Sequence, residues 1–152
     1  MTNNSTLYLN DLQVGQRFTS QSYTIDAGKI KQFAAEFDPQ PFHLDDVAAQ
    51  NSIFRGLAAS GWHTAALMMR LYTDHYLSKV ANLGSPGCDE LRWSKPVFPG
   101  DELCIRVTVM ETRRSDSKPD RGIVQSFTEV LNQKRDVVMS VKMVNFVRAR
   151  GS

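Results

Sequence analysis

Two carboxylates and an imidazole fall within eight residues of one another, in a segment that two prolines stiffen. The segment reads Asp38-Pro39-Gln40-Pro41-Phe42-His43-Leu44-Asp45. A rigid loop can hold a carboxylate and an imidazole at a fixed separation, as general acid–base catalysis on a bound water requires. Asp38 and His43 are therefore candidate catalytic residues. The structural alternative is that Asp38 ends a helix and His43 binds a backbone carbonyl, and for Asp45 we favour a helix cap.

A second candidate site lies where Ser60-Gly61-Trp62-His63 leads into a long apolar segment. Free backbone N–H groups and the positive end of the helix dipole meet at the start of a helix, and both suit an anion or a polarised carbonyl oxygen. Gly61 is therefore a candidate oxyanion-binding residue. The structural alternative is that Gly61 only permits the turn and Ser60 caps the helix. His63, on the first helical turn, could face a pocket or pack in the core.

The remaining clusters of charged or titratable residues give weaker signals. The turn Ser117 to Gly122, preceded by Arg113 and Arg114, is basic and could hold the phosphates of a nucleotide-like tail, although such turns are usually solvated. The three histidines show no metal-ligand spacing with Cys or Glu, so we expect no metal site. The chain also has no phosphate-binding glycine loop and no Gly-x-Ser-x-Gly motif.

Two helices and the segment between them are expected to position these residues. Asp26 is typical of an N-cap, and apolar residues at helical spacing predict a helix that ends at Asp38-Pro39, because a residue before proline leaves the α region. Residues Phe37 to Phe42 should form a rigid extended turn, followed by a short helix through Ala49. From Trp62 to about Leu77 the chain is apolar on nearly all sides, which predicts a helix buried on most of its surface.

The second half of the chain is typical of strands. Leu103, Ile105, Val107 and Val109 alternate with polar residues, and turn sequences separate the strand-like runs. Long strands joined by short turns form an antiparallel sheet. With an earlier strand over Arg17 to Thr24, the order predicts an α+β fold in which a five-stranded antiparallel sheet wraps one long helix. The later strands are expected at 91–93, 102–111, 122–131 and 137–147.

Composition narrows the functional class. The chain has 152 residues, of which 41% are hydrophobic, enough for one globular domain with a sizeable core. The net charge of +2 offers nucleic acid no strong electrostatic attraction, and no apolar run is long enough to span a membrane. Cys88 and Cys104 are expected to be reduced thiols, because no signal peptide is visible. We therefore expect a cytoplasmic protein that binds neither nucleic acid nor membrane.

Taken together, these motifs resemble the MaoC-like dehydratases, the (R)-specific enoyl-CoA hydratase family. The segment Phe37 to Asp45, with alanines close behind it, is similar to the hydratase signature, and Ser60-Gly61 resembles the oxyanion segment. The closing stretch also matches, in Arg92-Trp93, Pro96 to Asp101 and Lys118 to Gly122.

The resemblance extends from about Gly15 to Arg150. Residues 1–14 are therefore interpreted as an N-terminal arm and residues 15–150 as one hot-dog domain. Phe37 and Gln40 depart from the pattern, since the family often has Gly and Asn at these positions.

The resemblance implies that two subunits pair, as a homodimer or a dimer of dimers, with a pantetheine tunnel near their interface. It also implies reversible hydration of an enoyl thioester to a 3-hydroxyacyl thioester, on CoA or an acyl carrier, with no further cofactor. Asp38 and His43 would hold the reacting water, and the Gly61 N–H would bind the thioester carbonyl oxygen. The residues expected to contact the substrate are Gln40, Ser60, Trp62 and His63.

Two other functions stay open, as does the identity of the acyl chain. Hot-dog thioesterases generally place a carboxylate on or beside the central helix, and here Asp74 lies late in that helix. A non-catalytic acyl-thioester-binding subunit would keep Gly61 and the tunnel but would need neither Asp38 nor His43. The presence of both residues favours a hydratase.

Overall fold

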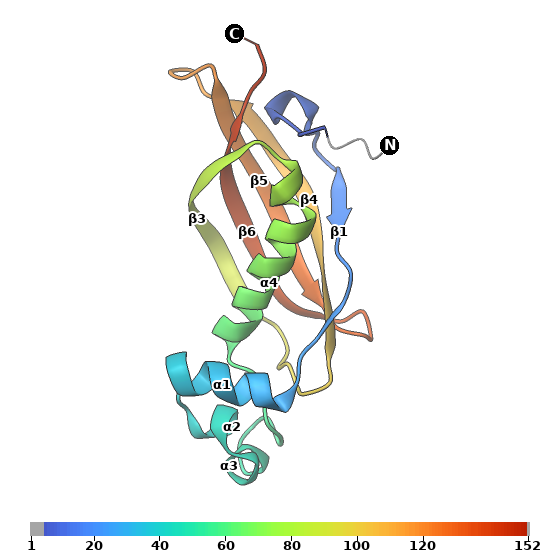
Figure 1. Ribbon diagram of the computed structural model, residues 1–152, viewed down its shortest axis with the longest axis vertical. Coiled ribbons are helices and arrows are strands. Elements are labelled where there is room, and N and C mark those ends of the chain that lie inside the picture. The colour runs from blue at the N-terminus through green and yellow to red at the C-terminus, as the bar shows by residue number, and fades with distance from the viewer. Residues whose placement is uncertain (1–4, 152) are drawn as a thin grey trace.

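The computed structural model describes residues 5–151, so residues 1–4 of the expected N-terminal arm lie outside the described part. Within it, helices and strands follow one another in an α+β order (Figure 1). In chain order they are η1 (Leu9–Asp11), β1 (Arg17–Thr19), β2 (Tyr23–Thr24), α1 (Ala27–Phe37), α2 (Pro41–Leu44), α3 (Asp46–Gln50), α4 (Gly61–His75), η2 (Leu77–Lys79), β3 (Asn82–Trp93), β4 (Glu102–Arg114), β5 (Arg121–Leu131) and β6 (Val137–Arg148).

The strands form one antiparallel sheet in the order β1-β4-β5-β6-β3, with β2 also paired to β4. Helix α4 lies along one face of this sheet, and α1, α2 and α3 gather at the end where α4 begins (Figure 1). The architecture predicted from the sequence, an antiparallel sheet around one long helix, is confirmed. The loop that leads from α3 to α4 therefore brings the two candidate segments to the same end of the molecule.

The single strand expected over residues 17–24 is two short strands. Ser20 interrupts it, because its Oγ accepts the N–H of Ile105 (2.9 Å) where a backbone carbonyl would continue the ladder. Strand β3 is longer than the predicted 91–93. Its first half lacks the alternating pattern of a strand, because Gly84 and Gly87 adopt positive φ at register shifts of the ladder.

The core fills the space between the sheet and one side of α4. Met68, Leu71 and Tyr72 of α4 are buried against alternate residues of β4, β5 and β6. The expectation that α4 is buried on most sides is wrong: Trp62 and Met69 are 59% and 39% exposed. The reason is that one sheet covers only one side of the helix, whatever the hydrophobicity of the other side.

The segment after Asp38 also differs from its prediction. Instead of an extended turn through Phe42, helix α2 begins at Pro41. Proline is favoured at the first helical position, because its fixed φ suits a helix and its missing N–H would have had no intrahelical partner. The predicted caps are confirmed, since Asp26 accepts the N–H of Lys29 and Asp45 that of Ala48.

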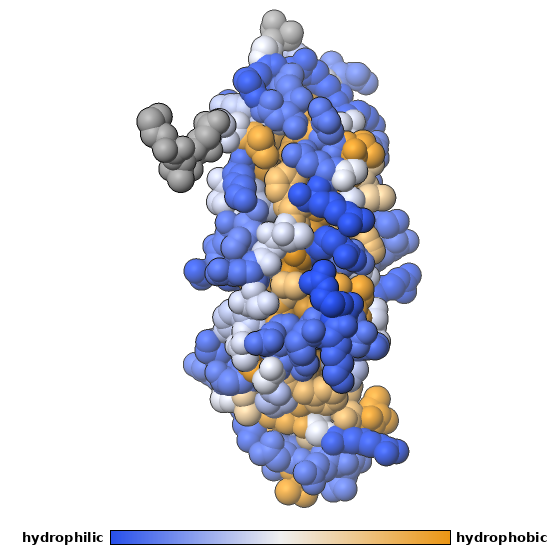
Figure 2. Space-filling view, turned by 90° about the vertical axis from the view of Figure 1, so that its right-hand side faces the viewer, coloured by the Kyte–Doolittle hydropathy of each residue, from blue (hydrophilic) through white to orange (hydrophobic). Residues whose placement is uncertain are grey.

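The described part of the N-terminal arm packs on the body of the domain. Leu9 and Leu12 are buried, and Leu7 bridges to Val80. Seen from the β1 side, hydrophobic residues show as a narrow band along the molecule between hydrophilic borders (Figure 2). Within residues 5–151, no helix is long and apolar enough to cross a membrane.

A buried polar network fixes α4 on the sheet. The Tyr72 hydroxyl donates to Asn145 Oδ1 (2.8 Å) and lies 3.2 Å from Ser126 Oγ, while Asn145 Nδ2 donates to Asn82 Oδ1 (3.0 Å). Burial raises the pKa of Tyr72 to about 12, with the bond to Ser126 opposing the rise, so the phenol stays neutral. These contacts connect α4 to strands β3, β5 and β6 at the level of Tyr72.

We predict that Tyr72→Phe lowers the free energy of unfolding by about 1–3 kcal/mol, because it leaves Asn145 Oδ1 without a buried donor. Urea denaturation measures the effect. Tyr76→Phe is the matched control, since the buried Tyr76 hydroxyl has no hydrogen-bond partner within the described residues. Equal losses in the two variants would contradict a stabilising role for the network.

Candidate active site

The end of helix α1 places Asp38. Its backbone N–H donates to Ala34 O (2.8 Å), and its φ of −153° takes the chain out of the helix ahead of Pro39. Helix α2 begins three residues later at Pro41, and its third residue is His43. Two helix ends, each set by a proline, therefore fix the separation of the carboxylate and the imidazole.

The imidazole of His43 is buried and oriented by the backbone. Its Nδ1 lies 2.6 Å from Ala58 O, and its exposed fraction is only 5%. Because a carbonyl oxygen can only accept, Nδ1 carries a hydrogen in this contact. The other ring nitrogen, Nε2, lies 3.4 Å from Asp38 Oδ2.

Ser60 joins Asp38 to the start of α4. Its Oγ donates to Asp38 Oδ2 (2.7 Å) and accepts the N–H of Trp62 (3.2 Å), so one hydroxyl serves as the N-cap of the helix and as a ligand of the carboxylate. Ser60 is fully buried. The position of Asp38 is therefore coupled to the position of the first turn of α4.

The first turn of α4 leaves one backbone donor free. The N–H groups of His63 and Thr64 both donate to Ser60 O, and that of Trp62 is taken by Ser60 Oγ. The Gly61 N–H has no acceptor within residues 5–151. This N–H lies at the positive end of the helix dipole, which makes it a suitable donor to a carbonyl oxygen that gains negative charge.

The residue at position 61 must be small, because Trp93 lies against it. A Cβ at this position would lie 2.5 Å from Trp93 Cε2, and the Trp93 Nε1 donates to Gly61 O at 2.8 Å. Trp62 packs edge-on against the same indole, with ring centroids 5.1 Å apart. Glycine at position 61 thus allows the Trp93 indole of β3 to pack directly against the first residue of α4.

These groups open into one cavity of about 400 Å³. Its lining combines aromatic rings with polar and charged side chains, as ligand-binding clefts generally do. The lining residues are Asp38, Gln40, Phe42, His43, Phe54, Ala59, Gly61, Trp62, Thr64, Trp93, Ser94, Lys95, Pro96 and Val97.

The surroundings of Asp38 keep its carboxyl ionised. Partial burial disfavours the charge, but hydrogen bonds from Ser60 and Gln40, together with the nearby His43, outweigh burial and hold the pKa of Asp38 below its ordinary value. The Gln40 amide supplies a short bond of 2.6 Å to Oδ1. Gln40 therefore keeps the amide function expected at its position, on the longer side chain.

Most of the residues predicted for the site lie together. Asp38, Gln40, His43, Gly61 and Trp62 all line the cavity. Ser60 lies beneath it, with its hydroxyl occupied by Asp38 and Trp62, and is not part of the lining.

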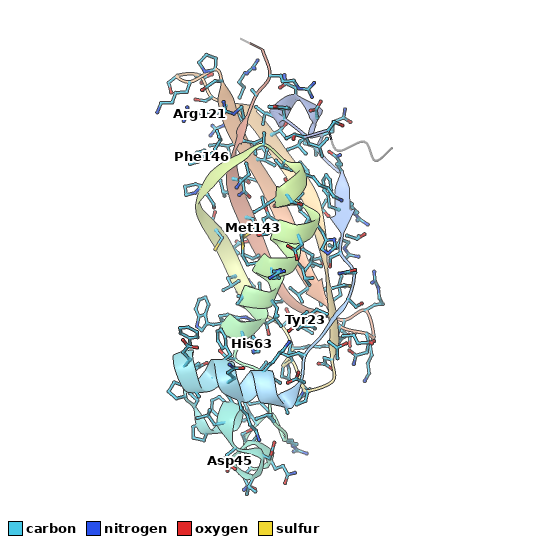
Figure 3. The ribbon with its side chains drawn as sticks, in the orientation of Figure 1. Tyr23, Asp45, His63, Arg121, Met143 and Phe146 are labelled. Carbon is cyan, nitrogen blue, oxygen red and sulfur yellow. The ribbon has the colours of Figure 1, made fainter. Side chains whose placement is uncertain are left out.

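His63 is also absent from the cavity lining and packs between α1 and α4 (Figure 3). Its ring stacks on Phe33 of α1, with centroids 4.6 Å apart and planes 7° from parallel. Burial lowers the pKa of His63, and the charge of Lys29 adds to this while Asp26 opposes it. The structure therefore brings His63 to the helix that ends in Asp38, rather than to the cavity.

Sequence reasoning missed the wall formed by Trp93 and the segment 94–97, together with Thr64. Trp93, Pro96 and Val97 enter the prediction only through the family resemblance, which assigns them no role. The contact of Trp93 with Gly61 joins residues 32 positions apart, and no local pattern reports such a contact.

Comparisons with known proteins show which proteins this chain is similar to. A family model described as "MaoC like domain" matches residues 11–131. The uncharacterised protein YdeM of Bacillus subtilis is 30% identical over 126 residues, which is 83% of this chain and 88% of that protein. Mesaconyl-CoA hydratase of Cereibacter sphaeroides is 42% identical over 77 residues, or 51% of this chain and 21% of that enzyme. This chain thus matches about a fifth of the hydratase's length.

Solved structures show the same fold. The MaoC-like dehydratase from Rhodospirillum rubrum is 46% identical, with a TM-score of 0.86 over 96% of this chain and 99% of that chain. The (R)-hydratase of A. caviae involved in PHA biosynthesis is 27% identical, with a TM-score of 0.70 over 88% and 96%. A Mycobacterium tuberculosis protein with a double hot-dog fold is 18% identical, with a TM-score of 0.83 over 97% of this chain and 46% of that chain. The predicted hot-dog fold is confirmed.

We predict that Ser60→Ala lowers the free energy of unfolding by about 2 kcal/mol, because it removes both a helix cap and a hydrogen bond to a carboxylate. The pKa of Asp38 should rise at the same time, since one donor to its ionised form is lost. Urea denaturation and an NMR titration of the Asp38 carboxyl carbon measure the two effects.

Asp26→Ala is the matched control for this prediction. It removes the cap of α1 without touching Asp38, so it should cost about 1 kcal/mol and leave the Asp38 titration unchanged. An unaltered Asp38 titration in Ser60→Ala would contradict the coupling between the cap and the carboxylate.

Proposed function

The chain belongs to the MaoC-like domain family, and from this premise we propose that it catalyses the reversible hydration of an enoyl thioester to a 3-hydroxyacyl thioester. The observation that carries the proposal is the meeting, in one cavity, of the Asp38 carboxylate, the His43 Nε2 and the unoccupied Gly61 N–H. These are the two kinds of group that the reaction needs, an acid–base pair for water and a donor for the thioester carbonyl.

Asp38 and His43 are suited to hold one water between them. We propose that the reacting form of His43 carries its hydrogen on Nδ1 alone, so that Nε2 accepts a hydrogen bond, as the ionised Asp38 carboxylate does. Two acceptors 3.4 Å apart make no direct hydrogen bond, whereas a water can donate one hydrogen to each. We infer that the water enters the reaction from this position.

The Gly61 N–H would bind the thioester carbonyl oxygen. As the water oxygen bonds to C3, the electrons of the C2–C3 double bond move towards that carbonyl and give an enolate-like transition state. A fixed backbone donor at this oxygen is typically worth about 3 kcal/mol. The helix dipole acts in the same direction.

The protons balance within the pair. One proton of the water passes to the Asp38–His43 pair as oxygen adds to C3, the other stays on the new hydroxyl, and the pair delivers a proton to C2. Dehydration runs through the same steps in reverse. A positioned acid–base pair of this kind contributes about 100- to 10,000-fold to the rate.

A thioesterase fits the geometry less well. Its carboxylate would lie on or beside α4 within reach of the thioester carbon, but Asp74 is near the far end of the helix and pairs with Arg70 (2.8 Å). A non-catalytic thioester-binding subunit would not need the buried, oriented imidazole of His43. The specific arrangement of Asp38 and His43 therefore favours a hydratase over both alternatives.

We also propose that two copies pair through strand β3. This strand is an edge of the sheet, and it is exposed along almost its whole length, with Leu83 and Trp93 each 42% exposed. A long exposed edge strand has backbone N–H and C=O groups without partners, and these can pair with another strand. The exposed side of α4 and the likeness to half of a double hot-dog protein support the same arrangement.

We predict that Asp38→Asn keeps the fold but lowers the hydration rate at least ~100-fold, because the amide cannot accept the proton of the water. The measurement is the loss of enoyl-thioester absorbance with crotonyl-CoA and with longer or branched enoyl-CoAs. A free-thiol assay runs in parallel.

Asp46→Asn is the matched control, because Asp46 is an exposed aspartate that forms a salt bridge with Lys31 and does not line the cavity. Its rate should equal that of the wild type. Wild-type turnover in Asp38→Asn would remove Asp38 from the mechanism, and thiol release by the wild type would replace the hydratase with a thioesterase.

For the pairing through β3, we predict a particle of twice 17.1 kDa by light scattering. If two β3 strands pair antiparallel about their midpoint, Cys88 of one copy lies near Cys88 of the other. Cys88→Lys would then bring like charges together and yield monomers. Met110→Lys, on β4 and 54% exposed, should leave the mass unchanged. A monomeric wild type would contradict the proposal.

A further inference from the structure

A second cavity lies far from the site above, under the turn between β4 and β5. Its volume is about 500 Å³. Arg121 and Phe146, which line it, lie at the end of the molecule opposite Asp45 (Figure 3). The lining residues are Arg113, Arg114, Ser115, Asp116, Ser117, Lys118, Arg121, Gly122, Ile123 and Phe146.

Positive charge exceeds negative charge around this cavity. Residues 113–121 contain four basic and two acidic side chains, a local net charge of +2. Arg121 pairs with Asp120 through two hydrogen bonds, and Arg114 donates to the backbone carbonyls of Arg150 and Gly151.

The two remaining cations, Arg113 and Lys118, have no carboxylate partner within residues 5–151. Both line the cavity, one from strand β4 and one from the turn. Guanidinium and ammonium groups without a carboxylate partner are the side chains that bind phosphate in proteins.

The floor of the cavity is apolar. Ile123 and Phe146 face each other across β5 and β6, on the side of the sheet turned away from α4, and both are half-buried. An aromatic face beside an arginine is a stacking surface for a nucleobase. A phosphate-binding rim above an aromatic floor is the combination that a nucleotide requires.

Hydrogen bonds within the turn shape the rim. Ser115 N donates to Arg121 O (3.0 Å), and Arg121 N donates to Lys118 O (3.2 Å). Ser115 Oγ accepts the N–H of Lys118 (3.1 Å) and lies 3.5 Å from Ser117 Oγ. The turn that carries Lys118 is therefore ordered, and two hydroxyls lie beside it as further donors.

We propose that this cavity binds the phosphates and base of a purine nucleotide, with Arg113 and Lys118 on the phosphates and Phe146 under the base. The shared chemistry is a phosphorylated adenosine, which is supplied either by the nucleotide end of a CoA thioester or by a free adenine nucleotide. A concave site with an aromatic floor suits a small ligand better than the convex acidic surface of a carrier protein.

The nucleotide site and the Asp38–His43 cavity of one chain are well separated. Phe146 pairs with Gly84, near one end of β3, and Trp93 at the other end lies against Gly61. Nine residues of strand correspond to roughly 30 Å. Binding of nucleotide is therefore measurable on its own, and its outcome does not depend on whether the chain is a hydratase.

Isothermal titration calorimetry with ADP, CoA, pantetheine and inorganic diphosphate tests the proposal. We expect ADP and CoA to bind and pantetheine not to bind at this site. Arg113→Gln/Lys118→Gln should weaken both ADP and CoA at least tenfold, and Phe146→Ala should weaken ADP while leaving diphosphate unchanged. Lys79→Gln/Lys134→Gln is the matched control, because it removes two exposed charges outside the cavity and should alter neither.

Two arms separate the sources of the nucleotide. In the antiparallel pairing through β3 proposed above, the Gly84 end of this strand in one copy lies near the Trp93 end in the other, so a CoA thioester would reach from the nucleotide site of one copy to the cavity of its partner. A raised KM for crotonyl-CoA in Arg113→Gln/Lys118→Gln, with kcat unchanged, assigns the site to the CoA substrate. An unchanged KM with weakened ADP binding assigns it to a free nucleotide.

Three results would overturn the nucleotide site. The first is that neither ADP nor CoA binds. The second is that both bind equally well to Arg113→Gln/Lys118→Gln and to the wild type. The third is that an acyl carrier protein binds in a way that needs these two residues, while ADP does not bind. If Phe146→Ala fails to fold, binding of ADP and CoA to the Arg113→Gln/Lys118→Gln variant still tests the proposal, because both residues are exposed.

Discussion

The hydroxyl of Ser60 makes two hydrogen bonds, and together they fix where helix α4 begins relative to Asp38. One bond caps the helix and so leaves the Gly61 N–H as the free donor of the first turn. The other holds the carboxylate whose oxygen lies 3.4 Å from His43 Nε2. The acid–base pair and the proposed carbonyl donor are thus set by one buried group, and the distance between them cannot change without breaking a cap or uncovering a charge. Both changes cost free energy.

The rest of the fold holds this group in place. Helix α4 is tied to the sheet through Tyr72 and Asn145, well beyond the site, so its first turn is carried on a rigid element. At the site itself, Trp93 of β3 occupies the space that a side chain at Gly61 would need. On the other side, His63 stacks on Phe33 and holds α1, the helix that ends in Asp38. Sheet, central helix and the N-terminal helices therefore all converge on the few residues around Ser60.

The sequence alone could predict the elements and the chemical groups, because both follow from local patterns. Alternation in β4 indicated the sheet, and two prolines around an acid and an imidazole indicated the site. Contacts between distant residues could not be predicted in this way. The partner of the Ser60 hydroxyl lies 22 positions earlier, and the indole against Gly61 lies 32 positions later. Local signals were also misleading where a residue suits two structures: Pro41 begins a helix instead of extending a turn, and the glycines of β3 hid a long strand.

The central claim is that Asp38 and His43 act as a unit on one water, and a double-mutant cycle of the hydration rate tests it most directly. Asp38→Asn, His43→Ala and the double variant are compared with the wild type in the enoyl-thioester absorbance assay. If the two residues hold the same water, the second substitution adds little to the first, and the double variant is about as slow as the slower single variant. Losses that multiply would show two independent roles and contradict the account, as would a double variant with wild-type turnover.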